Sequence, residues 1–346
     1  MPELFLELFS EEIPARMQAG AAADLRRLVT AALQALHPEE VETFYGPRRV
    51  ALRADVTAEV PATIGTERGP RVTAPDQALA GFLRKHGAGR EQLRREGEYW
   101  VLEKTAAAIA ARQLIGDALP MLLRRFPWPK SMRWGGGSAF TWVRPLRRIV
   151  CLLNGEVVRF DLRDGEDDGH GLRSDNLTEG HRFAAPGVFP VFSCADWREK
   201  LAVHRVLVDA AERRCRILRG LGAEATARDL VVVEDPELLD EVAGLAEWPV
   251  PLLGRIDPAF MGLPVEVMQV SMRVNQRYFS LRTPDGTAAP WFGFVANIEA
   301  DDGGRAIIAG NERVLRARFA DAQYFWESDR KRSLASRVKL LDGITF

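Results

Sequence analysis

The sequence has few cysteines and none of the long apolar runs that mark membrane proteins. Its three cysteines, Cys151, Cys194 and Cys215, are odd in number and far apart, which predicts reduced thiols rather than a disulfide framework or a zinc site. No apolar run is long enough to cross a bilayer, and Met1–Ser10 carries no basic segment before its apolar residues. These absences predict a cytoplasmic protein with no membrane span and no secretion signal.

Signatures of common enzyme classes are also missing. The sequence contains no Walker A loop, no dinucleotide-binding G-x-G-x-x-G, no H-E-x-x-H and no G-x-S-x-G. None of these enzyme classes is therefore indicated by the sequence. The net charge is −1, so any contact with nucleic acid must use a local basic patch. Only 6 of the 47 basic residues are lysines, so arginine is in large excess. Because alanine is also abundant, we ascribe this excess mainly to codon bias.

The most informative stretch is Phe126–Arg148, which reads FPWPKSMRWGGGSAFTWVRPLRR. Tryptophans alternate there with cations, and three successive glycines let the backbone approach a ligand closely. Aromatic planes beside guanidinium groups are typical of surfaces that hold single-stranded or distorted nucleic acid. The candidate contact residues are Lys130, Arg133, Trp134, Arg144, Arg147 and Arg148. The alternative is that Trp128 and Trp134 fill a junction between domains.

Other polar clusters have simpler interpretations. Asp164–Asp175 places carboxylates at several EF-hand positions, but its residues at positions three, eight and twelve are poor choices, which favours an acidic surface loop. His170 and His181 suit structural or solvated positions better than a metal site. Glu11–Glu12 suits the start of a helix better than acid–base catalysis. The arginines of 213–219 either track phosphates or form a solvated helix face. No metal site is predicted.

Hydrophobic periodicity predicts an α+β fold of several domains, with small mixed sheets and packed helices. In a first unit, residues 1–62, it predicts a strand at Phe5–Phe9, a helix that ends at His37-Pro38 and a strand at Val50–Val60 with one wet face. A helix-rich middle unit, residues 63–136, carries a helix at Asp76–His86, a strand at Tyr99–Glu103 and a long helix up to Arg125.

The third unit, residues 137–346, is predicted to be a larger α+β domain. Asn154-Gly155 between two apolar runs predicts a hairpin. A single helix is expected from Asp196 to a stop at Gly220 and Gly222, and another begins at Asp235-Pro236. An amphipathic helix follows from about Asn311.

Ten segments, in order, resemble the beta subunit of bacterial heterotetrameric glycyl-tRNA synthetase. They include FLELFSEEIP, YGPRRVAL, PWPKSMRWG, WVRPLR, GHRF and LPVEVMQVSMRVNQRYF, and together they cover essentially the whole chain. The resemblance implies a B3/B4-like module, as in the phenylalanyl-tRNA synthetase beta chain. It also implies that the HD-type and anticodon-binding domains of the family are absent here. The ending at Gly343–Phe346, just after a charged helical stretch, indicates an N-terminal portion or a short beta subunit.

The resemblance implies a partner enzyme. In the family, the alpha subunit holds the active site that uses ATP and magnesium to activate glycine, and the beta subunit binds tRNA within an assembly of two alpha and two beta chains. The resemblance implies that this chain is an accessory tRNA-binding and assembly subunit, with the six candidate residues as contacts to tRNA-Gly. It also implies that the chain has no catalytic residue and no cofactor of its own. The alternative is a structural scaffold that organises the alpha dimer without touching RNA.

Overall fold

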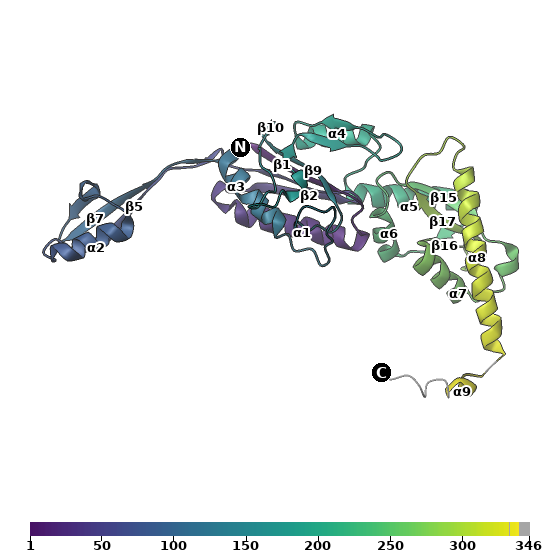
Figure 1. Cartoon of the computed structure of the whole chain (residues 1–346). Helices are drawn as coiled ribbons and strands as arrows, with labels where there is room; N and C mark the ends of the chain where they lie inside the picture. Colours follow the sequence, from purple (N-terminus) through teal and green to yellow (C-terminus); the bar gives the residue numbers. More distant parts are fainter. Residues whose placement is uncertain (332, 339–346) are drawn as a thin grey trace.

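The computed structural model of the chain describes residues 1–331 and 333–338 and has an elongated shape (Figure 1). A central sheet with its helices lies between an arm, residues 57–110, and a C-terminal unit that begins at α5 (Ala210–Thr226). The helices and several small sheets confirm the predicted α+β class. The B3/B4 likeness stays a prediction. Residues 332 and 339–346, with the ending at Gly343–Phe346, lie outside the described residues.

The central sheet combines strands from distant parts of the sequence. Strand β1 (Glu3–Ser10) lies in its middle and pairs antiparallel with β3 (Arg49–Asp55) on one side and with β9 (Leu146–Leu153) on the other. The order is β10-β9-β1-β3-β2, with β2 at Glu39–Gly46 and β10 at Glu156–Val157. Strand pairing thus crosses the divisions expected at residues 62 and 136, because periodicity locates a strand but does not identify its partner.

Both faces of this sheet are covered. Helices α1 (Ala15–Ala32) and α3 (Ala111–Arg124) share a core with Leu4, Leu6 and Leu8 on one face. Helix α4 (Cys194–Val203) packs on the other face, against the side chains that alternate with these. The prediction of a wet face for the strand at Val50–Val60 is therefore wrong, since Val50, Ala51, Leu52 and Ala54 of β3 are all buried.

An arm leaves the central sheet between β3 and α3. Its base is a ribbon of β4 (Glu59–Val60) and β8 (Ile109–Ala110), which β5 and β7 extend outward. At its tip is a small head, in which three strands in the order β5-β7-β6 pack with helix α2. The head comprises β5 (Thr63–Arg71), α2 (Asp76–His86), β6 (Leu93–Glu96) and β7 (Tyr99–Ala106). Its helix has the bounds predicted from the sequence.

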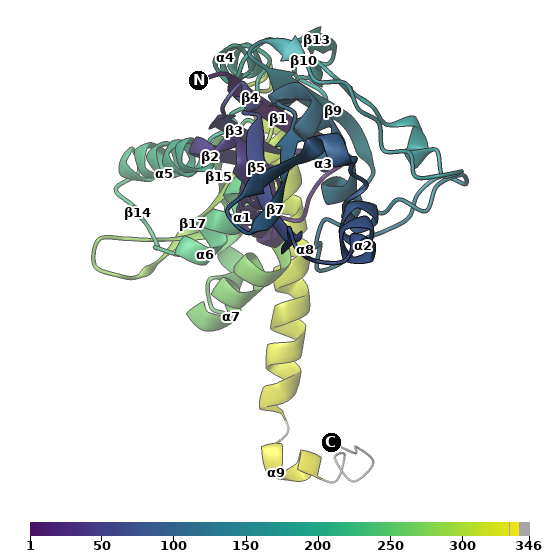
Figure 2. The same ribbon diagram turned by 90° about the vertical axis from the view of Figure 1, so that its left-hand side faces the viewer.

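The C-terminal unit has its own four-stranded sheet, in the order β14-β16-β17-β15. One core joins this sheet to α5 and α6, and a second joins it to α7 and α8. The elements are α5 (Ala210–Thr226), β14 (Val231–Val232), α6 (Pro236–Ala243), β15 (Val250–Arg255), α7 (Val265–Val270), β16 (Phe279–Arg282), β17 (Ala288–Ala296) and α8 (Arg305–Arg330). The far half of α8 projects beyond the unit (Figure 2).

The helix predicted from Asp196 to Gly220 is two helices, α4 and α5. The break lies at 204–209, where Arg205 has a φ of 60° and Asp209 caps α5 by accepting hydrogen bonds from Ala211 and Glu212. Helix α5 continues through both expected glycine stops. A β-carbon at Gly220 would lie 2.6 Å from Pro251 Cγ, so this glycine serves close packing against β15 rather than termination.

Two local predictions are confirmed. Asn154 and Gly155 have φ values of 51° and 84° and connect β9 to β10, as expected for a tight hairpin. Asp235 caps α6 by accepting a hydrogen bond from the backbone N–H of Leu238 at 2.9 Å. In residues 1–331 and 333–338, no helix is both long enough and apolar enough to cross a membrane.

Arg213 joins the central sheet to the C-terminal unit. Its buried guanidinium donates to the carbonyls of Ala243 and Leu207 at 2.8 Å and of Tyr45, on β2, at 2.9 Å. Burial lowers the pKa of Arg213 to about 10. Neither expected role fits this residue, because a guanidinium held by backbone carbonyls inside the protein reaches neither phosphate nor solvent.

Candidate nucleic-acid interface

The stretch after α3 folds into a loop that closes on itself, which we call loop 127–142. Met132 and Trp142 form an isolated antiparallel bridge across it, with N–O distances of 2.8 and 3.3 Å. Trp142 is buried and meets the ring of Trp128 edge-on, with centroids 5.1 Å apart. Trp128 also packs on the buried Phe126. Trp128 therefore packs against the core of the central sheet and does not fill a junction between domains.

Trp134, on the same loop, faces a different partner. Its ring stacks on the imidazole of His170, with centroids 4.2 Å apart and planes 20° from parallel. His170 belongs to the acidic loop 161–173, so the stack ties the two loops together. One face of the indole is thus already occupied, and the side chain is half-buried.

Asp167 makes the second tie between the two loops. Its carboxylate accepts hydrogen bonds from Arg124 Nη2 at 2.6 Å and from the backbone N–H groups of Ala139 at 3.0 Å and Gly169 at 2.9 Å. Hydrogen bonds, first of all from the Ser138 hydroxyl, hold the pKa of Asp167 far below its usual range. In the part of the chain that the structure describes, no group of three or more acidic, histidine or cysteine side chains is placed to hold a metal.

Three of the predicted cations are exposed and make no ion pair within the described residues. Lys130 and Arg133 lie on loop 127–142 and Arg144 directly after it, and the Met132–Trp142 bridge holds these two segments side by side. None of the three makes an ion pair with a residue in 1–331 or 333–338. Exposed cations without carboxylate partners are available for phosphate contacts.

The other two predicted cations face carboxylates. Arg147 Nε lies 3.2 Å from Glu11, and Arg148 Nε lies 2.8 Å from Glu179. Glu11 and Glu12 also pair with Arg182. The two acids thus neutralise arginines and do not begin α1, which starts at Ala15. The six predicted residues share one stretch of chain, but only part of that stretch carries uncompensated positive charge.

A buried ion cluster that periodicity did not predict lies beside this stretch. Arg49 is 1% exposed, and its guanidinium lies 2.9 Å from Glu7 and 3.1 Å from Glu247. Arg48 lies over the ring of Phe9 at 4.5 Å. Glu247 precedes β15, so the cluster joins the central sheet to the C-terminal unit. The Arg48-Arg49 pair in YGPRRVAL was the available signal, because two charges at the start of an apolar strand require buried partners.

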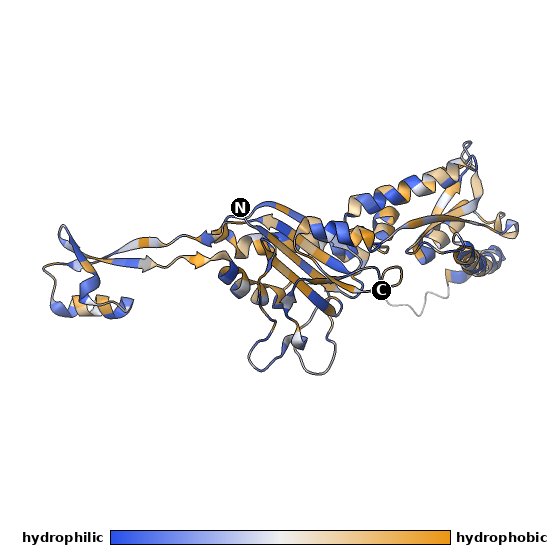
Figure 3. Ribbon diagram, turned by 90° about the horizontal axis from the view of Figure 1, so that it is seen from above, coloured by the Kyte–Doolittle hydropathy of each residue, from blue (hydrophilic) through white to orange (hydrophobic). Residues whose placement is uncertain are grey.

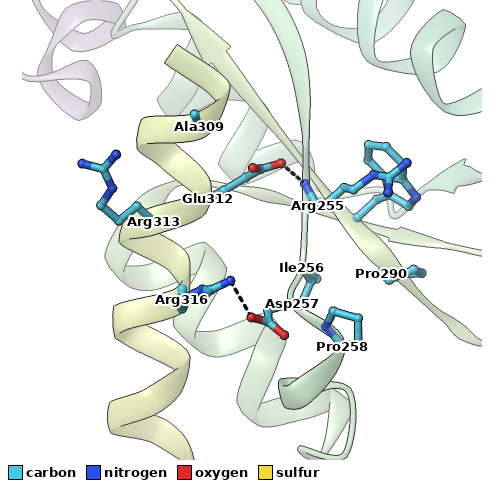
Figure 4. A pocket seen from close by; sticks show the side chains of 10 residues that line it. Arg255, Ile256, Asp257, Pro258, Pro290, Ala309, Glu312, Arg313 and Arg316 are labelled. Carbon is cyan, nitrogen blue, oxygen red and sulfur yellow. Dashed lines mark hydrogen bonds and ion pairs between the residues drawn. The ribbon is translucent and has the colours of Figure 1, made fainter. Parts of the chain in front are cut away.

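A cavity of about 680 Å³ lies between α8 and the edge strand β15 (Figure 4). Most of its charges are compensated. Arg316 pairs with Asp257 at 2.7 Å, and Glu312 accepts a hydrogen bond from the backbone N–H of Arg255 at 2.7 Å. Arg313 points away from both acids. The Glu312 contact satisfies a donor on the exposed edge of the sheet, so this surface protects that edge.

Comparisons with known proteins agree with the resemblance. A family model described as glycyl-tRNA synthetase beta subunit matches residues 4–346. A glycine–tRNA ligase beta subunit of Phenylobacterium zucineum is 49% identical over 353 residues, which cover 100% of this chain and 51% of the relative. The beta subunits of Paracoccus denitrificans and Rhodospirillum centenum are each 44% identical, over 99% and 100% of this chain.

The chain belongs to the glycyl-tRNA synthetase beta subunit family. It spans about half the length of the curated relatives that it matches, 51% and 52% for those of Phenylobacterium zucineum and Rhodospirillum centenum. The family match extends over the arm, the central sheet and the C-terminal unit alike. The loops tied by Asp167 and His170 and the buried cluster around Arg49 are therefore features of a family member.

Proposed function

We propose that this chain is an accessory tRNA-binding and assembly subunit of a cytoplasmic glycine–tRNA ligase. In this proposal, a separate alpha subunit catalyses the attachment of glycine to tRNA-Gly with ATP and magnesium, and this chain neither makes a bond nor binds a cofactor. The observation that carries the proposal is the family match along residues 4–346, together with the three exposed cations of the tied loops.

The contribution of such a subunit is positional. Lys130 and Arg133 lie on loop 127–142 and Arg144 lies directly after it. The loop is fixed by the Met132–Trp142 bridge, the Trp134–His170 stack and the Asp167 carboxylate. Cations on a fixed loop bind phosphates at a lower entropic cost than cations on a free one. A tRNA held in this way presents its acceptor end to the alpha subunit, which lowers the cost of bringing the reactants together.

The test is a tRNA-Gly filter-binding titration with Arg133→Ala plus Arg144→Ala. Loss of two phosphate contacts is expected to weaken binding about tenfold and to reduce the slope of log K against log salt by about one to two. The matched control is Arg26→Ala plus Arg27→Ala, which removes the same charge from the exposed face of α1 and is expected to leave affinity unchanged. Equal affinity and slope in the test variant and the unsubstituted chain would remove the loop from the proposal.

The pairing of Arg147 and Arg148 with acids favours a second candidate, a scaffold that organises the alpha dimer without touching RNA. A scaffold gives only weak, salt-sensitive retardation of tRNA-Gly in an electrophoretic shift at physiological salt. It also copurifies with the alpha subunit as well as before when Arg133 and Arg144 are replaced. An electrophoretic shift of tRNA-Gly that the unsubstituted chain causes and that resists added salt excludes the scaffold.

A further inference from the structure

The head at the tip of the arm stands apart from the rest of the molecule (Figure 1). Residues 63–68 of β5 pair with residues 101–106 of β7, and this ribbon spans roughly 20 Å at the usual rise per residue. The hydropathy colouring of Figure 3 shows a mostly hydrophilic head. Its buried apolar side chains are Leu79, Val101 and Leu102, a small core for a unit of this length. A head that buries few apolar side chains and lies far from the central sheet is suited to contact another molecule.

The head sheet has a helix on one face only. Leu102 is buried on the side of α2, where Lys104 contacts His86 of that helix at 2.9 Å. Tyr99 and Val101 alternate with Leu102 along β7 and therefore point to the opposite face. The pairing register places Arg71 opposite Tyr99 and Arg68 opposite Val101, so both arginines share this face. No described helix packs there, and we call it the open face.

The open face carries uncompensated positive charge around an aromatic ring. The Arg68 guanidinium lies 3.5 Å from the centroid of Tyr99, and Arg71 Nε donates to the Tyr99 hydroxyl at 3.2 Å. Both arginines are exposed, and neither makes an ion pair with any residue in 1–331 or 333–338. Glu96 and Glu103 on this face pair with Arg94 and not with Arg68 or Arg71.

We propose that the open face of the head, centred on Arg68, Arg71 and Tyr99, is a second RNA contact of this chain, separate from loop 127–142. Guanidinium groups bind phosphate oxygens with two hydrogen bonds, and a guanidinium plane held against a tyrosine offers a stacking surface to an unpaired base. Charge complementarity selects a polyanion over a protein surface. The inference rests on the proposed function, in that the RNA is the same tRNA; the arm lets one chain hold it at two distant points.

The test uses the full chain with Arg68→Ala plus Arg71→Ala, titrated against transcribed tRNA-Gly at several salt concentrations. We expect about a tenfold loss of affinity and a salt slope reduced by about one to two. The matched control is Arg84→Ala plus Lys85→Ala, which removes the same charge from the last turn of α2. This control is expected to bind within about twofold of the unsubstituted chain, because the open face is intact.

An unchanged affinity in the Arg68 and Arg71 variant, or an equal loss in both variants, overturns the inference. So does a variant that binds RNA normally but no longer copurifies with an alpha subunit, because the face then meets a protein. If the unsubstituted chain binds tRNA-Gly while the open-face variant binds equally well, only this inference fails; if the unsubstituted chain does not bind, the proposed function fails as well.

Hydrogen exchange on the unsubstituted chain provides a second measurement that does not depend on a variant's folding. Addition of tRNA-Gly is expected to slow exchange of the backbone amides in β5 and β7 of the head. Exchange in residues 63–106 that is the same with and without RNA contradicts the proposal.

Discussion

The central sheet and the head of the arm differ in how many faces of the sheet are covered by helices. In the central sheet, helices cover both faces, and Phe5 on one side and Leu6 on the other are both fully buried. In the head, α2 covers one face and the other carries Arg68, Arg71 and Tyr99. The first arrangement supplies stability, and the second leaves charge available for a partner.

The two regions also treat charge differently. Around Arg49, carboxylates of Glu7 and Glu247 compensate a cation that has almost no exposure to water. In the head, the arginines of the open face are exposed and lie beside an aromatic ring instead. A buried cation requires its partners for the fold to be stable, whereas an exposed cation remains free to exchange water for phosphate.

The largest expected effect comes from the core under α4. Trp197 is fully buried, with its ring centroid 5.1 Å from that of Phe5 and 5.6 Å from that of Phe44. Trp197→Ala is expected to lower the free energy of unfolding by about 4 kcal/mol, because it removes a large buried side chain and leaves a cavity. Urea denaturation followed by circular dichroism measures the loss.

The matched substitution in the head is Leu79→Ala. Leu79 is 5% exposed, and its loss is expected to cost about 2 kcal/mol of local stability. Limited proteolysis should then cut within residues 63–106 while the urea transition of the rest of the chain stays where it was. A shift of that main transition would show that the head and the central sheet unfold as one unit.

The second effect in size comes from the ion cluster. Glu247→Gln removes one of the two carboxylates that compensate Arg49 and is expected to cost about 3 kcal/mol, at the low end for a broken buried pair because Glu7 remains. Glu224→Gln is the control, since the side chain of Glu224 is 48% exposed and its pair with Arg228 is expected to contribute at most about 1 kcal/mol. Similar losses in both variants would mean that burial does not decide the strength of these pairs.

The smallest effect is a difference in tyrosine ionisation. The hydrogen bond from Arg71 lowers the pKa of Tyr99 on the head, whereas burial raises the pKa of Tyr278 in the C-terminal unit from 10 to about 12. The unfolded chain loses the Tyr278 proton first, so the contribution of this residue to stability is complete below pH 10 and is lost as the pH rises towards 12.

A spectrophotometric titration of phenolate measures this difference. Tyr99→Phe is expected to remove the earliest phase and Tyr278→Phe the last one. A folded chain in which Tyr99 and Tyr278 ionise together would contradict the contrast between a half-buried phenol beside a guanidinium and a buried phenol.

Local features of the fold were predictable because their causes lie within a few residues. The helix at Asp76–His86, the hairpin at Asn154-Gly155 and the cap at Asp235 each follow from neighbouring side chains and backbone preferences. Long-range features were not predictable in this way. The pairing of β1 with β9, and the role of Gly220 beneath Pro251, depend on segments far away in the sequence.

The candidate interface shows the same division. The sequence indicated a stretch rich in basic and aromatic residues, and in the structure Lys130, Arg133 and Arg144 are exposed on that stretch. Composition did not show that Arg147 and Arg148 meet carboxylates, nor that Arg213 is buried among carbonyls. An arginine can bind phosphate only if no carboxylate or carbonyl from another segment of the fold already holds it. A single sequence does not reveal these partners. The contact residues for tRNA therefore stay a prediction.

We propose that this chain acts through the surfaces that it presents and makes no bond itself. The most direct test is ATP–pyrophosphate exchange by the purified chain, in the presence and absence of glycine and with every trace of an alpha subunit removed. We expect no glycine-dependent exchange above background. Exchange that requires glycine and persists as the chain is purified further would contradict it.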